Sequence, residues 1–348
     1  MGPGGYFFSL FGHAAICVHD AQSPAGRCYN WGTADFSNPL RLAYQVTYGR
    51  AQFWVGVIDL PRMLSNYQAE DRSLYRQRLS LSAEATARLV ASLHRVDQRE
   101  QSLYTYHNLR DNCTTRIRDA IDEATSGVLG SDPSVHQRDQ PSFRAYSHEG
   151  FAGSPHLIAG SLLLFGRAVD RPTSRYEGMF LPSVLREELS RQLHVTPEPV
   201  YVRKGPSPRG SRAAGPVFLL GGSALLSVGC LLLARRRHPR LARLLVATPL
   251  GVIGSLLLLL RCVSPLAELR YNEVLLLCWP CDLLIPWLPA RWLRAYLKLR
   301  LGSCGLAAVA AAVGLLHQPL TGPLLLVVPL LLSLWAAMAR CSHDGDSA

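Results

Sequence analysis

The sequence lacks the short motifs that mark several common protein classes. It has no zinc-finger spacing, no RNP motif and no basic helix with interleaved aromatic residues, so its net charge of +11 does not indicate nucleic-acid binding. It has neither a GxSxG nucleophile elbow nor a Walker loop. A zinc site could be assembled from His13, His19, Cys28, His107 and Cys113, but no short paired spacing among these residues supports it, so we expect no metal site and no cofactor.

The composition of the 348-residue chain changes near residue 215. The preceding part is polar and mixed, whereas the following part is dominated by Leu, Ala, Val and Gly and is interrupted by short arginine clusters. The mean hydropathy of +0.10 averages these two halves. We therefore expect a soluble domain over residues 1–200, a flexible linker over 201–215 and a membrane domain over 216–340.

Five apolar runs in the last part predict about five membrane segments, over residues 216–234, 244–260, 274–288, 304–316 and 320–338. The first, second and fifth reach the length of about 17–20 residues that a span needs, while the third and fourth are short enough to be re-entrant or tilted. The arginine-rich segments after the first and third runs are expected to be cytoplasmic loops. This orientation places the carboxyl terminus inside and the soluble domain outside.

A domain outside the membrane needs an export signal. The chain begins MGPGGYFFSLFGH, without a basic n-region and an apolar h-region. We therefore expect the signal segment to lie upstream of this start. The alternative is a cytoplasmic domain with inverted topology, against the pattern of positive charge.

Three residues in the third apolar run are chemically notable. Cys278 and Cys281 form a CWPC motif, but no thioredoxin-like βαβ pattern surrounds it, so we interpret both as packing residues of the membrane domain. Asp282 follows directly. An ionisable side chain in a membrane segment is a functional hypothesis by default, so Asp282 is included among the candidate site residues as one that faces a polar interior.

The front of the soluble part has the pattern of a β-sheet. Strands are predicted around His13 and over residues 27–36, 42–49 and 52–60. A hairpin of the first two would bring Asn30 or its neighbours roughly opposite His13. Cys17 and Cys28 fall on these adjacent strands and either form a disulfide or remain two buried thiols.

Helical patterns follow the strands. The segment 64–81 carries helix formers, and Ser82 begins an amphipathic helix. Asp111 or Asn112 is expected to cap a helix over about 114–124. Residues 130–160 are expected to be rich in loops, and a further helix is predicted before residue 195.

The candidate chemistry lies in two residues a hundred positions apart, His13 and Cys113. Cys113 stands at a predicted helix start, where the positive end of the helix dipole favours the thiolate, and Arg116 would add positive charge. Gly12 permits a close approach beside His13, which could act as base and proton donor. The alternative is that Cys113 is a packed residue and His13 an ordinary surface or core histidine.

The segments PGGYFFSLFGHAAICV, YNWGTADF, YTYHNLRDNCTTRIRD and RPTSRYEGMFLPSVL occur in this order over residues 3–195. Together they resemble the DUF4105 domain, the N-terminal periplasmic domain of the Lnb-type bacterial lipoprotein N-acyltransferases. The resemblance implies an α+β, circularly permuted NlpC/P60-like (papain-like) domain, followed by an all-α multi-span membrane domain. The family's histidine falls on His13 and its cysteine on Cys113. For the third, orienting residue Asn30 is the first choice and Asp35 the second.

The resemblance also implies an activity and a location. Cys113 would take an acyl chain from a phospholipid as a thioester and pass it to the α-amino group of a lipoprotein, with His13 as acid and base and with Asn112 and Arg116 positioning the helix start. The enzyme would lie in the bacterial inner membrane, with its N-terminal domain in the periplasm. The alternatives are an NlpC/P60-like peptidase or amidase acting on cell-wall peptides, and a non-enzymatic membrane scaffold.

Overall fold

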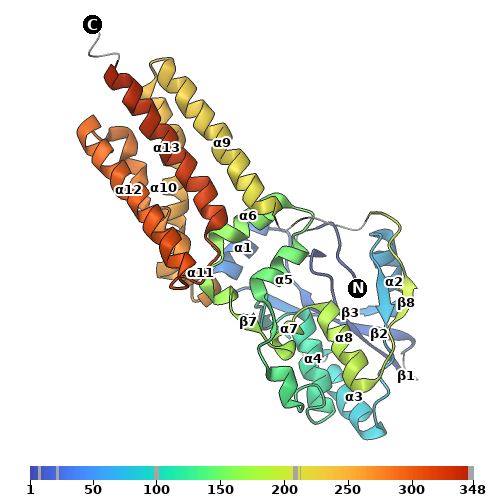
Figure 1. The fold of residues 1–348 in the computed structure, drawn as a ribbon. Coiled ribbons are helices and arrows are strands. Elements are labelled where there is room, and N and C mark those ends of the chain that lie inside the picture. Colours follow the sequence, from blue (N-terminus) through green and yellow to red (C-terminus); the bar gives the residue numbers. More distant parts are fainter. Residues whose placement is uncertain (7–8, 21–22, 98–101, 207–210, 212, 344–348) are drawn as a thin grey trace. The chain divides into compact units, whose positions relative to one another are not determined.

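The computed structural model describes residues 1–6, 9–20, 23–97, 102–206, 211 and 213–343. The chain divides into two compact units. Residues 1–146 and 172–208 form the first, which we call the α/β unit, and residues 147–171 and 209–348 form the second, the helical unit. Figure 1 shows the strands of the first unit and the long helices of the second. The architecture is thus a mixed α+β region with a sheet, followed by a helical region.

The α/β unit is built on a four-stranded antiparallel sheet with strand order β1-β2-β3-β5. Its strands are β1 (Ile16–Asp20), β2 (Ser23–Thr33), β3 (Gln52–Asp59) and β5 (Tyr104–Thr105). The register places Cys17 opposite Cys28, and the two form a disulfide. Of the two alternatives for these cysteines, the structure therefore has the cross-link. Two short antiparallel pairs complete the unit: β4 (Leu74–Arg76) with β8 (Glu198–Tyr201), and β6 (Gln140–Ser142) with β7 (Pro172–Thr173).

Further helices of this unit pack on the sheet or on one another. They are α2 (Leu60–Ala69), α3 (Ala83–Asp97), α4 (Cys113–Ala124), α7 (Arg175–Gly178) and α8 (Pro182–Leu193), with a 3-10 turn at η2 (Pro133–His136). In α3, Leu89 and Leu93 are buried four residues apart, so one face of the helix meets the core. They pack in one cluster with Ile117 and Ile121 of α4 and with Tyr29 of β2. Burial of each such side chain stabilises the fold by about 1.5–3 kcal/mol. This core holds the start of α4 against the sheet.

Four predictions for residues 1–164 are wrong. The helical pattern over 64–81 holds only to the end of α2 at Ala69, because the chain turns at Asp71, which has φ +49°, and then enters β4. His13 lies before β1 rather than in a strand, because Gly12 has φ +84° and its N–H bonds to Ser9 in a turn. Residues 42–49 mostly form helix α1 (Pro39–Thr47) instead of a strand, because Asn38 caps its first turn and Pro39 occupies a favourable first position. The expected loops over 130–160 contain α5 (Phe143–Gly150) and α6 (Pro155–Leu164).

The helical unit contains α6, η3 (Arg167–Val169), α9 (Ala214–Arg235), α10 (Pro239–Val263), α11 (Ala267–Arg270), η4 (Glu273–Leu276), η5 (Pro280–Trp287), α12 (Ala290–Ala312) and α13 (Thr321–His343). Helices α9, α10 and α13 are long and apolar enough to cross a membrane. They correspond to the first, second and fifth apolar runs. The predicted linker of 201–215 lies partly outside the described residues.

The third apolar run forms no α-helix. Its 3-10 turns run antiparallel to α10, and the two segments approach closely at glycines of α10. A Cβ atom at Gly254 would lie 2.6 Å from the carbonyl oxygen of Cys278. Near the other end Arg243 donates to the carbonyl of Leu288 at 2.9 Å. The arginine-rich segment 290–300, expected as a loop, instead forms the first turns of α12. It contains no proline or glycine that would interrupt a helix.

Candidate active site

His13, Asn30 and Cys113 come together in the α/β unit from three separate elements. His13 lies in the loop before β1, Asn30 lies in β2, and Cys113 is the first residue of α4. The Nε2 atom of His13 is 3.3 Å from Oδ1 of Asn30. The hairpin of β1 and β2 therefore sets the asparagine beside the histidine, as the sequence predicts.

The amide of Asn30 is oriented by the backbone around it. Its Nδ2 atom donates to the carbonyl of Cys28 at 3.2 Å and to that of Gly56 at 3.5 Å. Because both amide hydrogens have carbonyl acceptors, Oδ1 is left to accept a hydrogen bond from His13 Nε2. This arrangement fixes the tautomer of the imidazole and leaves Nδ1 for the thiol.

Cys113 is half-buried, and its thiol is ionised more easily than usual. Burial raises the pKa of the thiol, but the charge of His13 and hydrogen bonds from His13, Ala14 N–H and Thr114 outweigh it and lower the pKa to about 7. About half of the thiol is therefore thiolate at neutral pH. Among the interactions that stabilise the thiolate, those with His13 are the largest.

The start of α4 is held by Asn112, which is its N-cap. The Oδ1 atom accepts from the backbone N–H groups of Thr114 and Thr115 at 2.9 and 3.0 Å. In turn, the backbone N–H of Asn112 donates to Oγ1 of Thr115 at 2.8 Å. The Nδ2 atom donates to the carbonyls of Asn108 and Phe180 at 2.9 and 3.0 Å. Asn112 is buried, so the cap fixes the position of the cysteine that follows it.

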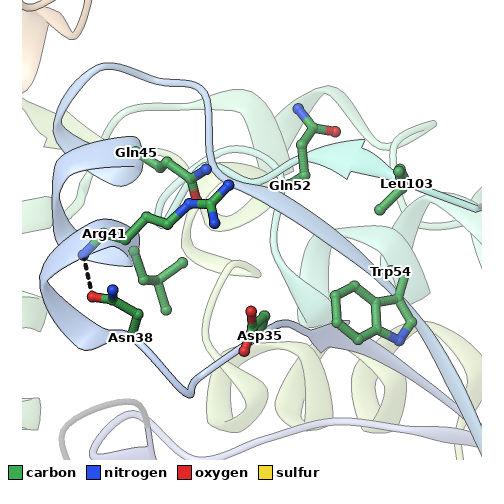
Figure 2. A pocket seen from close by; sticks show the side chains of 8 residues that line it. Asp35, Asn38, Arg41, Gln45, Gln52, Trp54 and Leu103 are labelled. Atoms are coloured by element: carbon green, nitrogen blue, oxygen red, sulfur yellow. Dashed lines mark hydrogen bonds between the residues drawn. The ribbon is translucent and has the colours of Figure 1, made fainter.

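The other residues proposed near the cysteine have different surroundings. The guanidinium of Arg116 pairs with Asp111 at 2.6 Å and lies 4.4 Å from the ring centroid of Tyr104. Its charge is thus balanced by a neighbour, and the lowering of the Cys113 pKa comes from His13. Asp35 is exposed beyond the end of β2, where it accepts from Ser37 N–H at 3.0 Å. It lines a separate surface hollow (Figure 2).

Asp282 lies in the helical unit, within η5, and is fully buried. Its two carboxylate oxygens each accept from Arg300 of α12 at 2.8 Å. The hydroxyl of Tyr296 donates to Oδ1 at 2.6 Å, and the backbone N–H of Trp279 donates to Oδ2 at 3.2 Å. The carboxylate is therefore fully satisfied and ties η5 to α12. Arg300, which sequence reasoning treated as part of a loop, is its partner.

Two residues near the pair are not evident from the sequence. Tyr67 of α2 stacks on the His13 ring, with centroids 6.2 Å apart, and the Arg72 guanidinium lies 4.6 Å from the Tyr67 ring centroid. No local motif marks this tyrosine, because the contact depends on how α2 packs. Gly32 has φ +96°, and a Cβ atom there would lie 3.5 Å from Cβ of Cys113. A glycine inside a strand pattern was the available signal for this close approach.

Comparison with known proteins identifies the segment that holds this site. Residues 1–141 match the family described as the Lnb N-terminal periplasmic domain. Searches of curated proteins and of solved structures give no match. The chain therefore carries an Lnb N-terminal periplasmic domain that contains His13, Asn30 and Cys113, and its three candidate spans indicate a multi-pass membrane protein.

Proposed function

We propose that this protein is a membrane-anchored cysteine acyltransferase of the lipoprotein N-acyltransferase type. Cys113 is the nucleophile, His13 is the general acid and base, and Asn30 orients the imidazole. The observation that carries the proposal is the placement of one imidazole between the Asn30 amide and the Cys113 thiol. This order of amide, imidazole and thiol is that of papain-like enzymes, and a permuted NlpC/P60-like fold is part of the proposal.

In the first half-reaction the Cys113 thiolate attacks the carbonyl carbon of an acyl ester in a phospholipid. The bond from that carbon to the ester oxygen breaks, and protonated His13 gives its proton to the departing oxygen. The products are an acyl thioester on Cys113 and a lysolipid. The Cys113 N–H has no acceptor among the residues that the structure describes, so it is available to the oxyanion at the helix start.

In the second half-reaction the α-amino group of a lipoprotein's lipid-modified N-terminal cysteine attacks the thioester. Neutral His13 removes a proton from the amine, the bond to sulfur breaks, and an amide forms. The thiolate is regenerated. Anchoring in the inner membrane, with the domain in the periplasm and the carboxyl terminus in the cytoplasm, raises the local concentration of both substrates.

The test uses bacteria that lack their own lipoprotein N-acyltransferase. The full chain is fused to an export signal and expressed as wild type, Cys113→Ser, His13→Ala and the matched control Cys262→Ser. Mass spectrometry of a reporter lipoprotein's N-terminal peptide is then run with fragmentation, which locates each acyl chain. We expect an α-N-acylated peptide with wild type and Cys262→Ser and not with the other two.

The mass of the product distinguishes two sources of the acyl chain. Transfer from phospholipid adds the mass of one chain, whereas transfer from an ester already on the reporter leaves its mass unchanged. A free α-amine with correctly inserted wild-type protein would contradict the transferase assignment for this acceptor. Release of cell-wall peptides by the same four proteins would then be measured.

A further inference from the structure

Exposed apolar side chains occur on helix α1 and in segments near it. The exposed large apolar side chains of the described part of the α/β unit are Tyr6, Phe36, Leu40, Tyr44, Tyr75, Leu103, Val200 and Val202. Leu40 and Tyr44 lie on α1, Phe36 lies in the segment that leads into it, and Leu103 lines the hollow that α1 borders. We call these four the α1 face. Exposed apolar side chains grouped in this way mark an interaction surface.

Helix α1 has the side-chain distribution of a helix that lies in a membrane interface. Leu40 is 84% exposed and Tyr44 is 58% exposed, and their spacing of four residues puts them on the same side. Leu42, on the opposite side, is buried and anchors the helix to the unit. Arg41 of α1 and Arg50, three residues after the end of α1, are exposed. The helix itself contains no acidic residue, and Asp35 lines the same hollow as Arg41. Apolar side chains flanked by arginine suit a surface of anionic phospholipids.

The α1 face is close to the candidate nucleophile. A Cβ atom at Gly32 would lie 3.5 Å from Cβ of Cys113, and Phe36 follows Gly32 by only four residues. Four residues of extended chain span at most about 14 Å. Leu103 directly precedes Tyr104, whose ring lies against Arg116 in the same helix as Cys113. The backbone of Phe36 therefore lies within about 14 Å of that of Gly32, so a bilayer that reaches Phe36 comes near the thiol.

The hollow beside α1 is too small to enclose a lipid. It has a volume of about 190 Å³ and is bordered by Arg41, Gln45, Gln52 and Trp54 among others (Figure 2). Pockets that enclose drug-sized ligands measure about 300–1,000 Å³. A diacyl lipid that approaches this side would keep its chains in the bilayer, so the surface has to meet the membrane itself.

The covalent organisation keeps the α/β unit at a membrane. The chain passes between the two units three times, after residues 146, 171 and 208, and the helical unit contains three candidate spans. We propose that the α1 face docks on the lipid bilayer, with Leu40 and Tyr44 inserted among the acyl chains and Arg41 and Arg50 at anionic headgroups. This inference goes beyond the proposed function, because docking does not depend on acyl transfer.

Photo-crosslinking tests the proposal in the full chain. Benzoylphenylalanine replaces Tyr44 in one variant and, as the matched control, Tyr75 of β4 in another. Both tyrosines are exposed, and in Figure 1 the paired strand β8 lies well apart from α1 within the same unit. The proteins are reconstituted in nanodiscs of phosphatidylcholine and phosphatidylglycerol and irradiated, and the labelled peptides are analysed by mass spectrometry. We expect the mass of one phospholipid on the Tyr44 variant and not on the Tyr75 variant.

A second pair of measurements tests the charge and separates this proposal from the enzymatic one. Arg41→Glu with Arg50→Glu should lower the lipid adduct at position 44, and the adduct should persist in a Cys113→Ser background. Loss of acyl transfer with a retained adduct would leave docking intact. A crosslink from position 44 to a second copy of the chain or to another protein, or equal lipid adducts at both tyrosines, would overturn the proposal. A further variant carries benzoylphenylalanine in place of Leu40. The proposal would also be overturned if neither the Tyr44 nor the Leu40 variant gave a lipid adduct while both retained the Cys17–Cys28 disulfide.

Discussion

Replacing His13 by alanine should raise the pKa of Cys113 from about 7 to at least its ordinary value of 9.0. In the native protein burial favours the neutral thiol, and the charge and hydrogen bond of His13 outweigh that effect. Without the imidazole, only Ala14 N–H and Thr114 remain to stabilise the thiolate. A change of two pKa units corresponds to about 2.7 kcal/mol of lost thiolate stabilisation.

The thiolate fraction at pH 7 should fall from about one half to about one hundredth, a roughly 50-fold loss. The alkylation rate should fall less, because a thiolate of higher pKa is more nucleophilic. With a Brønsted coefficient of about 0.4–0.5, a pKa higher by two makes the thiolate roughly eightfold more reactive. The alkylation rate at pH 7 should therefore fall by about sixfold. The midpoint of the pH profile is therefore a sharper measure than the rate at any one pH.

The assay is alkylation of the full-length protein by iodoacetamide across the pH range from about 5 to about 10, which brackets both expected midpoints. The peptide that contains Cys113 is quantified by mass spectrometry. The Cys262 peptide from the same digest is the internal control, because its profile should not differ between wild type and His13→Ala. A midpoint that stays near 7 in the variant would show that another group lowers the thiol pKa, and the stabilisation of the thiolate by His13 would be refuted.

Three further substitutions test the surrounding framework. Asn30→Ala should release the His13 ring and lower acyl transfer by about 10–100-fold at unchanged melting temperature, and a loss of stability equal to the loss of activity would contradict an orienting role. Asn112→Ala should cost about 1–2 kcal/mol in thermal unfolding, and Asn112→Asp should not recover it, because a carboxylate oxygen would face the carbonyls of Asn108 and Phe180. Arg300→Met should destabilise the helical unit by about 3–5 kcal/mol by leaving Asp282 unpaired, and adding Asp282→Leu should restore most of the loss. If the losses of stability caused by Arg300→Met and Asp282→Leu simply added in the double variant, the result would contradict a buried ion pair.

The closely packed third run bears on how the helical unit is organised. Cβ atoms at Gly251 and Gly254 of α10 would clash with the segment that contains η5, so these glycines admit its backbone. The same segment carries Asp282, whose pairing with Arg300 joins it to α12. Arg300 and Arg243 also donate to the carbonyls of Leu277 and Leu288, so side chains of neighbouring helices satisfy part of this irregular backbone.

Several features of this protein follow from local sequence, because the interactions that create them reach only a few residues. An asparagine side chain bonds to N–H groups two and three positions ahead, so DNCTT predicts a capped helix at Cys113, and the structure has it. The apolar runs that form α9, α10 and α13 are recognisable from composition and length. The strand β3 follows from its β-branched and aromatic content.

Tertiary structure decided the features that depend on packing between distant segments. The family resemblance left both Asn30 and Asp35 as partners of His13, and only the pairing of β1 with β2 brings Asn30 to the ring. Tyr67 against His13 and Arg300 against Asp282 arise from helix packing, which no local pattern encodes. Composition and caps reflect interactions between residues close in sequence. A site assembled from three separate elements forms only when these elements have packed together in the hydrophobic core.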